Sequence, residues 1–348
     1  MTLRPFLLAL VSAALFGAAT PLSKYLLMDL GPFQLSGLLY LGAAVGVLPA
    51  TLRRRPIQPP WQMDVPTRRR LLGAICFGGI VGPVLLLFGL RLAAATSVAL
   101  WLNLEAVATA VLGVWFFRDH LGRNSWIGAA GILVGALVLS WGQGAAGWQA
   151  GLLVAAACLC WGFDNHLTAL IDGITPAQST LWKGLAAGSV NLAVGLAVEP
   201  FGIGLTVGVA ALVVGVFAYG VSIVLYITAA QQLGATRSQL IFSTAPYFAI
   251  VLSVMWLGET ISPAQIAAAV LVGASVVLLT VEWHSHDHAH VALDHEHWHD
   301  HADEHHVHQH TDAPGSSNPT PHTHRHQHTP LHHAHHHWPD LHHRHEHE

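Results

Sequence analysis

Long apolar stretches alternate with short polar connections over most of the chain. A helix needs about 20 mostly apolar residues to cross a bilayer, because the hydrocarbon core is roughly 30 Å thick and a helix rises about 1.5 Å per residue. Backbone groups in lipid must be hydrogen-bonded within their own segment, so the stretches predict helices; outer-membrane strands would be shorter and would alternate in polarity. Short connections predict antiparallel neighbours. The ten predicted spans are roughly 4–27, 33–52, 71–90, 95–117, 125–141, 149–171, 178–198, 205–230, 236–257 and 263–281.

The chain contains an internal duplication. Leu100–Ser140 and Leu240–Thr280 share a pattern of two apolar runs joined by a short polar turn. At a shift of 140 positions a Val-Leu-x-Val motif recurs, and Asp119 corresponds to Glu259; a Leu-Val-Gly-Ala motif follows in both copies after a slip of two residues. The duplication predicts two five-span units, 1–141 and 148–281, followed by a tail, 282–348.

The arginines predict the orientation in the membrane. Arg4 precedes the first span, and among the connections the odd-numbered ones contain only Arg91. The positive-inside rule therefore puts both termini in the cytoplasm. Since five is an odd number, the two units must cross in opposite senses, as an inverted repeat with a pseudo-two-fold axis in the membrane plane. The remaining arginines of the membrane part lie in or beside even-numbered connections: Arg53, Arg54, Arg55, Arg68, Arg69, Arg70, Arg118, Arg123 and Arg237.

Composition agrees with an all-α membrane protein of ten transmembrane helices. Hydrophobic residues make up 53% of the chain and charged residues 10%, and the mean hydropathy is +0.48, which excludes an ordinary soluble domain. The first span follows Arg4 as a secretory signal would, but it is too long and nine spans follow it, so we expect it to be retained. The three cysteines lie inside spans and are interpreted as apolar filler: Cys76, Cys158 and Cys160.

Glu105 is the most costly residue in the predicted spans. It lies near the middle of the bilayer, where a carboxylate must be paired, protonated or hydrated. Trp101 and Thr109 share its helical face, and Asn103 points to another side. Glu105 is interpreted either as a proton carrier facing a cavity or as a structural carboxyl group. Lys24 is interpreted as reaching to the membrane interface or as a partner of Glu105.

The sixth and seventh spans bring in a second set of polar residues. Asp164 and Lys183 lie at nearly equal depth on either side of a turn, so they can pair, either as a structural lock or as part of a solute site. Asn165 is adjacent to Asp164. His166, about 200° around the helix from Asp164 and nearer the cytoplasm, is interpreted as an interface histidine.

Polar side chains form one stripe on the eighth span and another on the ninth. Steps of three and four residues put each set on one side of its helix, where hydroxyl-tipped rings suit a cavity for partly apolar solutes; interfacial anchoring is the alternative for the tyrosines. Pro246 should bend the ninth span beside its stripe. The stripes are Tyr219, Ser222 and Tyr226, and Thr236, Gln239, Ser243 and Tyr247.

The tail differs completely from the membrane part. Of 27 histidines only His120 and His166 lie before residue 282, which leaves 25 in the tail. A segment this polar cannot build a hydrophobic core. We therefore expect the tail to be disordered without a ligand. Histidines at i, i+2 can chelate Ni, Zn, Co or Cu, and spacing does not choose among them. The candidate ligands are His284, His286, His288, His290, His295, His297, His299 and His301.

The paired units that end in Asp119 or Glu259, each followed by a Gly-containing span, resemble the EamA domains of the drug/metabolite transporter superfamily. The resemblance covers about residues 4–281 in two copies, and the WGFDNHLT and WKGLAAG stretches with the His-rich tail are similar to a bacterial subgroup. It implies a ten-helix inner-membrane transporter, often an exporter of metabolites or amino acids, with the central helices of each half lining the path. The first copy departs from the pattern in having Arg118-Asp119-His120 where the second has Gly258-Glu259-Thr260.

The sequence therefore predicts a secondary transporter of small organic solutes with Glu105 as proton carrier. The alternatives are a transition-metal transporter and a membrane metal sensor, both of which would use the tail. We expect no enzyme, because no nucleophile–base set, P-loop or HExxH motif is present, and no cofactor other than a divalent metal on the tail. Expected partners are the lipid bilayer, a small solute, divalent metal ions and, as an open alternative, a second copy in a homodimer, but no nucleic acid.

Overall fold

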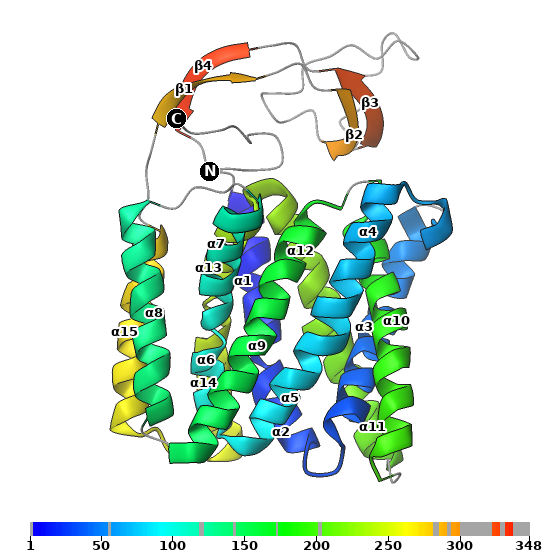
Figure 1. The fold of residues 1–348 in the computed structure, drawn as a ribbon. Coiled ribbons are helices and arrows are strands. Elements are labelled where there is room, and N and C mark those ends of the chain that lie inside the picture. Colours follow the sequence, from blue (N-terminus) through cyan, green and yellow to red (C-terminus); the bar gives the residue numbers. More distant parts are fainter. Residues whose placement is uncertain are drawn as a thin grey trace.

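The computed structural model describes residues 3–54, 57–117, 122–141, 144–171, 173–200, 204–280 and four segments of the tail. Within these residues, nine helical stretches are long and apolar enough to cross a membrane. The tenth expected span is a helix whose apolar part, Pro263–Leu278, is shorter than the other nine. Figure 1 shows the helices as one bundle with their axes roughly parallel.

Several spans consist of more than one helix. We number the spans 1 to 10 in chain order, and the end of the bundle opposite to the start of α1 is called the outer end. The elements are α1 (Leu3–Gly17) and α2 (Ala19–Leu26) in span 1; α3 (Pro32–Arg54) in span 2; η1 (Pro60–Gln62) in the connection; α4 (Val65–Gly73), η2 (Ala74–Val81) and α5 (Gly82–Leu92) in span 3; α6 (Ala95–Trp101) and α7 (Leu104–Phe117) in span 4; α8 (Arg123–Trp141) in span 5; α9 (Gly144–Ala169) in span 6; α10 (Pro176–Val198) in span 7; α11 (Leu205–Val214), η3 (Gly215–Val221) and α12 (Ser222–Leu233) in span 8; α13 (Ala235–Phe242) and α14 (Ala245–Leu257) in span 9; and α15 (Pro263–Thr280) in span 10.

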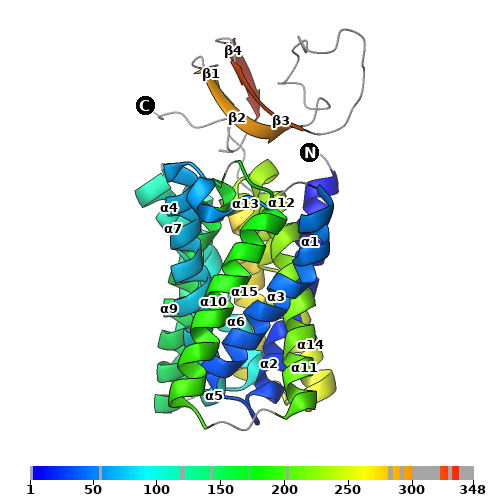
Figure 2. The same ribbon diagram turned by 90° about the vertical axis from the view of Figure 1, so that its right-hand side faces the viewer.

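Equivalent helices of the two repeats pack against each other in opposite directions. A Cβ on Gly37 of α3 would touch Leu192 of α10, and a Cβ on Gly184 of α10 would touch Ala44 of α3. The partner number falls in α10 as it rises in α3, so spans 2 and 7 are antiparallel. Figures 1 and 2 show α3 beside α10. Spans 5 and 10 behave in the same way, because a Cβ on Gly131 of α8 would touch Ser275 of α15 and a Cβ on Gly135 would touch Val272. Antiparallel pairing of equivalent spans is the geometry expected of an inverted repeat.

Spans 3 and 8 both contain a π-helical segment, η2 and η3, at positions that differ by about 140 residues. Such wide turns are rare and are frequent at functional sites. Spans 4 and 9 are interrupted at equivalent places, at Leu102–Asn103 and at Ser243–Thr244. Pro246 lies in the first turn of α14, directly after the interruption that we expected it to cause. The irregular backbone of both repeats therefore lies towards the middle of the bundle.

The described part of the tail forms four short strands. These are β1 (Ser285–His290), β2 (Asp294–His299), β3 (His322–Gln327) and β4 (Leu331–His336). β1 pairs with β4 and β2 with β3, both antiparallel. In β1, β2 and β3 histidine occupies every second position, which suits an extended strand. Figure 1 shows the strands beyond the end of the bundle where α1 begins.

Candidate functional site

Glu105 lies in the first turn of α7, two residues after the interruption of span 4. Its side chain is buried, with a relative exposure of 6%. Oε1 accepts a hydrogen bond from Asn165 Nδ2 of α9, at 2.9 Å. The bonding partner is an amide and not a cation, so it leaves the charge of an ionised Glu105 unneutralised.

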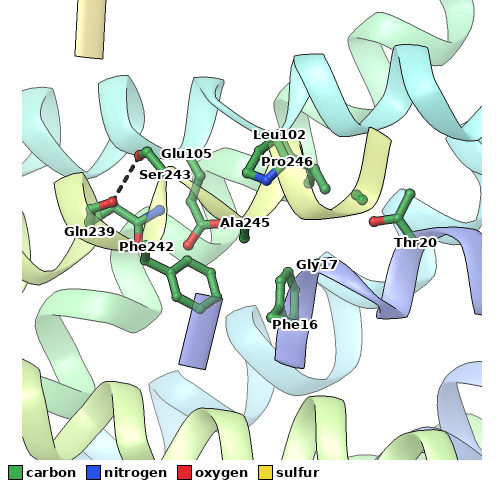
Figure 3. Close-up of a pocket in the computed structure, with 11 residues that line it drawn as sticks. Phe16, Gly17, Thr20, Leu102, Glu105, Gln239, Phe242, Ser243, Ala245 and Pro246 are labelled. Atoms are coloured by element: carbon green, nitrogen blue, oxygen red, sulfur yellow. Dashed lines mark hydrogen bonds between the residues drawn. The ribbon is translucent and has the colours of Figure 1, made fainter. Parts of the chain in front are cut away.

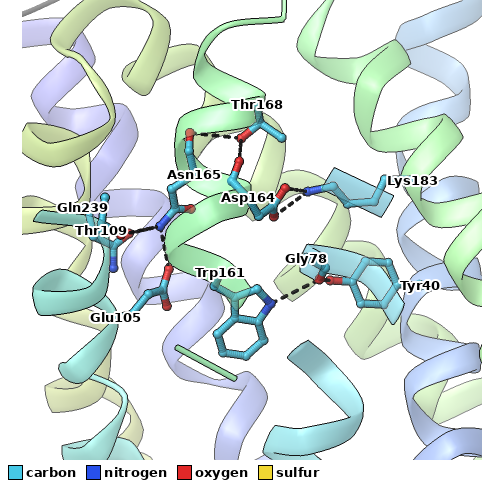
Figure 4. A network of polar contacts seen from close by, with 10 residues as sticks. All are labelled: Tyr40, Gly78, Glu105, Thr109, Trp161, Asp164, Asn165, Thr168, Lys183 and Gln239. Atoms are coloured by element: carbon cyan, nitrogen blue, oxygen red, sulfur yellow. Dashed lines mark hydrogen bonds and ion pairs between the residues drawn. The ribbon is translucent and has the colours of Figure 1, made fainter. Parts of the chain in front are cut away.

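The amide of Asn165 joins the two repeats. Besides Glu105, Thr109 Oγ1 of α7 and Gln239 Oε1 of α13 each lie 3.1 Å from Nδ2, so the two amide hydrogens are shared among three acceptors. Figure 4 shows the amide between these three acceptors. The side chain of Asn165, from the second repeat, thereby contacts α7 of the first repeat and α13 of its own repeat. A change in the charge of Glu105 would act directly on this connection.

Asp164 and Lys183 form a buried ion pair beside this network. Lys183 Nζ lies 2.6 Å from both carboxylate oxygens, as expected from the equal depth of the two residues. Gly78 in the wide turn of span 3 makes room for it, since a Cβ there would lie 2.0 Å from Asp164 Oδ2. Asp164 is paired with the cation Lys183, whereas Glu105 is bonded to the neutral amide of Asn165. The two buried carboxyl groups therefore have different electrostatic surroundings.

A central cavity lies next to both features. Its empty volume is about 500 Å³, open solvent at the mouth included. Tyr226 lines the cavity, and its buried hydroxyl has no hydrogen-bond partner among the residues that the structure describes. The cavity is lined by Phe16, Tyr40, Glu105, Trp161, Asp164, Asn165, Thr168, Lys183, Tyr219, Ser222, Ile223, Tyr226, Ile227 and Phe242.

A second cavity lies on the other side of Glu105 and extends towards α2 and α14 (Figure 3). Its empty volume is about 300 Å³, open solvent included. Gly17 allows α1 to approach α14 here, because a Cβ would lie 2.5 Å from the carbonyl oxygen of Ala245. The lining residues are Phe16, Gly17, Thr20, Leu102, Glu105, Gln239, Phe242, Ser243, Ala245, Pro246 and Ala249. Phe16, Glu105 and Phe242 therefore line both cavities.

Three of the predicted site residues line neither of these two cavities. Trp101 is buried and its Nε1 donates to the carbonyl of Ala136 at 3.3 Å. Asn103 donates to the carbonyl of Leu100 within its own turn, and its Oδ1 is buried without a partner. Tyr247 donates to the carbonyl of Ala269 in α15. The other nine predicted residues line one or both cavities: Glu105, Asp164, Asn165, Lys183, Tyr219, Ser222, Tyr226, Gln239 and Ser243.

Two further expectations are settled by hydrogen bonds. Lys24 Nζ donates to the carbonyls of Leu90 and Ala93 at the outer end, so the hypothesis that it pairs with Glu105 is wrong. His166 is buried and not interfacial: its Nε2 lies 2.9 Å from the carbonyl oxygen of Thr109, and its ring stacks on Phe117 at 4.3 Å. The prediction considered the helix of His166 by itself, and that sequence alone does not show that α7 packs against this side of α9.

Sequence reasoning missed the aromatic wall of the central cavity. Phe16 makes edge contacts with Trp161 and Tyr219, and the ring of Tyr40 lies 5.4 Å from that of Tyr219. Tyr40 and Trp161 Nε1 both donate to the carbonyl of Gly78, within the wide turn of span 3. Phenylalanine and tryptophan are ordinary in apolar spans, so their types gave no signal. The polar stripe on span 8 was the one sequence signal on this side of the cavity, because all three of its residues line it.

The candidate metal ligands of the tail are only partly within the structure. His284 and His301 lie outside the described residues. Asp119, the acidic residue of the repeat pattern in the first unit, also lies outside them. Three of the others belong to β1 and three to β2, where the backbone alone is described. Among the side chains that the structure does describe, no group of three or more His, Cys, Asp or Glu residues is arranged to hold a metal ion.

Comparisons with known proteins agree with this architecture. The model of the EamA-like transporter family matches residues 3–141 and 148–281. A solved structure titled "Crystal structure of protein" is similar with a TM-score of 0.63 and 17% identity, over 81% of this chain and 98% of the other. Identity this low shows a shared fold alone. A search of curated proteins found no match.

Proposed function

The chain belongs to the EamA-like transporter family, whose members carry small solutes across membranes, and we propose that it exports a small organic solute across a bacterial inner membrane with both termini in the cytoplasm. Two inverted repeats around a central cavity suit alternating access, in which one half rocks against the other about a fixed site. The lining of the cavity supports an organic solute: aromatic rings provide an apolar surface, and Glu105, Asp164, Lys183 and Tyr226 provide polar contacts.

One observation carries the proposed mechanism. Glu105 lines both cavities and is bonded to the amide of Asn165, which also reaches Gln239 of the other repeat. A buried carboxyl group without a cationic partner is much less costly when neutral, so exchange of a proton changes the energy of this junction. We propose that Glu105 takes up a proton on one side and releases it on the other, and that solute binding in the central cavity alternates with protonation.

The test is transport by purified protein in proteoliposomes with an imposed pH gradient. Radiolabelled amino acids, nucleosides, sugars and organic cations first identify a solute. Glu105→Gln should then abolish the dependence of the rate on the gradient while solute exchange at equal pH persists. Glu199→Gln is the matched control, since it makes the same change far from the cavity, where Glu199 caps α3. Full gradient dependence in Glu105→Gln would show that Glu105 is not the proton carrier.

A second candidate function is the handling of divalent transition metals by the tail. In β2 and β3 three histidine pairs stand opposite each other, namely His295 with His326, His297 with His324 and His299 with His322. Directly opposed residues of an antiparallel pair have Cβ atoms about 5 Å apart, and alternate residues share a face. Six histidines of one ribbon therefore share a face at chelating spacing for Zn, Ni, Co or Cu.

Deletion of residues 284–348 separates the two functions. If the chain transports an organic solute, the deletion should leave that transport unchanged in proteoliposomes. Growth of a deletion strain complemented with the full chain or the truncated chain, across Ni, Co, Zn and Cu, tests the metal function. A metal phenotype that requires the tail, with no transported organic solute, would favour the second candidate.

A further inference from the structure

Three helical segments from both repeats pack together at the outer end of the bundle. α2 and α6 belong to the first repeat and α14 to the second, and each packs against the other two. Tyr25 stacks on Trp256 at this end, with ring centroids 5.7 Å apart. The second cavity ends beneath these helices, at Thr20 of α2 and Ala249 of α14.

Glu259 connects the two repeats at this point. Its two carboxylate oxygens accept hydrogen bonds from the backbone N–H groups of Ala95 and Thr96, each at 2.8 Å. These are the first two residues of α6, whose N–H groups have no partner within the helix. The preceding Gly258 has φ +67°, a left-handed conformation that ends α14 and turns the chain towards α6.

Gln265 adds a second connection from the same repeat. Ser262 and Gln265 form a reciprocal cap at the start of α15, in which each side chain accepts from the backbone N–H of the other. The amide of Gln265 also donates to Thr96 Oγ1 and to Ser97 Oγ, at 2.8 and 2.9 Å. The first turn of α6 is thus held by four hydrogen bonds from the second repeat.

We propose that Glu259 and Gln265 form a latch between the two repeats, which closes the outer end of the path and must release before the path opens to that side. α6 is separated from α7 by the interruption at Leu102–Asn103, so it can move while α7 keeps Glu105 in place. The bonds of the latch are made to backbone and hydroxyl groups, which water can replace when α6 swings away.

The chain provides a matched control for this latch. Glu199 uses both carboxylate oxygens to cap Phe33 and Gln34 at the start of α3, each at 2.9 Å and also at the outer end. Its contacts connect spans 2 and 7, which pack along their whole length and do not surround the second cavity. Loss of this cap should therefore reduce stability without opening the path.

The experiment measures access to the second cavity from the outer end; it requires no transported solute and rests only on the orientation that the proposed function includes. Thr20→Cys is introduced after Cys76, Cys158 and Cys160 are replaced by alanine, and right-side-out vesicles are treated with a membrane-impermeant maleimide. Glu259→Gln should raise the labelling rate roughly tenfold, because it removes one charge-assisted hydrogen bond of the pair. Gln265→Ala should raise it less, and Glu199→Gln should leave it unchanged.

Labelling at the parent rate in both latch variants overturns the proposal, and so does an equal increase in Glu199→Gln. If the Glu259→Gln variant does not accumulate in the membrane, the labelling rate of Gln265→Ala alone tests the proposal, because this variant keeps the carboxylate cap of α6. Thermal denaturation of each purified variant checks that a faster rate comes from an opened path and not from unfolding.

Discussion

Lys183 Nζ lies 2.6 Å from each carboxylate oxygen of Asp164, in a pair whose two side chains are almost fully buried. The pair joins α9 to α10 within the second repeat and forms part of the wall of the central cavity. Because burial removes hydration from both ions, each depends on the other for compensation.

Asp164→Asn and Lys183→Met should each destabilise the protein strongly, by about 3–5 kcal/mol, because one buried charge loses its partner. The double variant Asp164→Asn/Lys183→Met should recover most of this loss, since it contains no uncompensated charge. Thermal denaturation in detergent measures all three. A double variant as unstable as the sum of the single variants would show that the pair is held by packing and not by charge.

Asn165 and Glu105 should be energetically coupled. Asn165→Ala removes the donor that Glu105, Thr109 and Gln239 share, so its cost should depend on whether residue 105 carries a carboxylate. In a double-mutant cycle with Glu105→Gln, we expect a coupling of about 1–2 kcal/mol in thermal stability.

The control for that cycle is Asn191→Ala. Asn191 donates to Ser36 Oγ and to the carbonyl of Gly79, with no bond to Glu105, so its effect should add to that of Glu105→Gln within about 0.5 kcal/mol. Additive effects in both cycles would mean that the hydrogen bond of Asn165 to Glu105 contributes little to stability.

Tyr226→Phe should weaken the binding of solutes that can accept a hydrogen bond. Tyr226 lines the central cavity and its buried hydroxyl has no partner in the described part of the chain, so its removal costs the empty protein little. The expected result is a rise in KM of about 5–10-fold with little change in kcat, measured in proteoliposomes. Tyr247→Phe is the matched control, because that hydroxyl is bonded to Ala269 and lines neither cavity. Equal KM values for both variants would remove Tyr226 from the solute site.

The positions of the spans could be predicted well because bilayer thickness and backbone hydrogen bonding leave few alternatives. Span 4, expected at 95–117, is Ala95–Phe117, and the third begins earlier than expected, at Val65, because its first turns are polar and carry arginines. The wide turns in spans 3 and 8 gave no sequence signal. They depend on packing between spans, such as the fit of Gly78 against Asp164.

The site was predictable where a residue was costly and unpredictable where its role depends on a neighbour. Glu105, Asp164 and Lys183 stand out in any apolar span, and their depths alone indicated the ion pair. Lys24 and His166 needed knowledge of which helix lies beside them. Glu259 contacts α6 across 164 residues of sequence. The repeat pattern singles out Glu259 but gives no information about this contact.

Gly31→Ala tests how the outer end of span 2 is held. A Cβ at position 31 would lie 2.0–2.4 Å from the carboxylate atoms of Glu199, which would have to leave Phe33 and Gln34. We expect a loss of about 2 kcal/mol, the value of a charged cap with its hydrogen bonds, and little further loss when Glu199→Ala is added. Gly204→Ala is the control, because a Cβ there meets nothing within 4 Å and φ is −63°. If thermal denaturation gives the same small change for both glycines, the cap moves without cost and contributes little to stability.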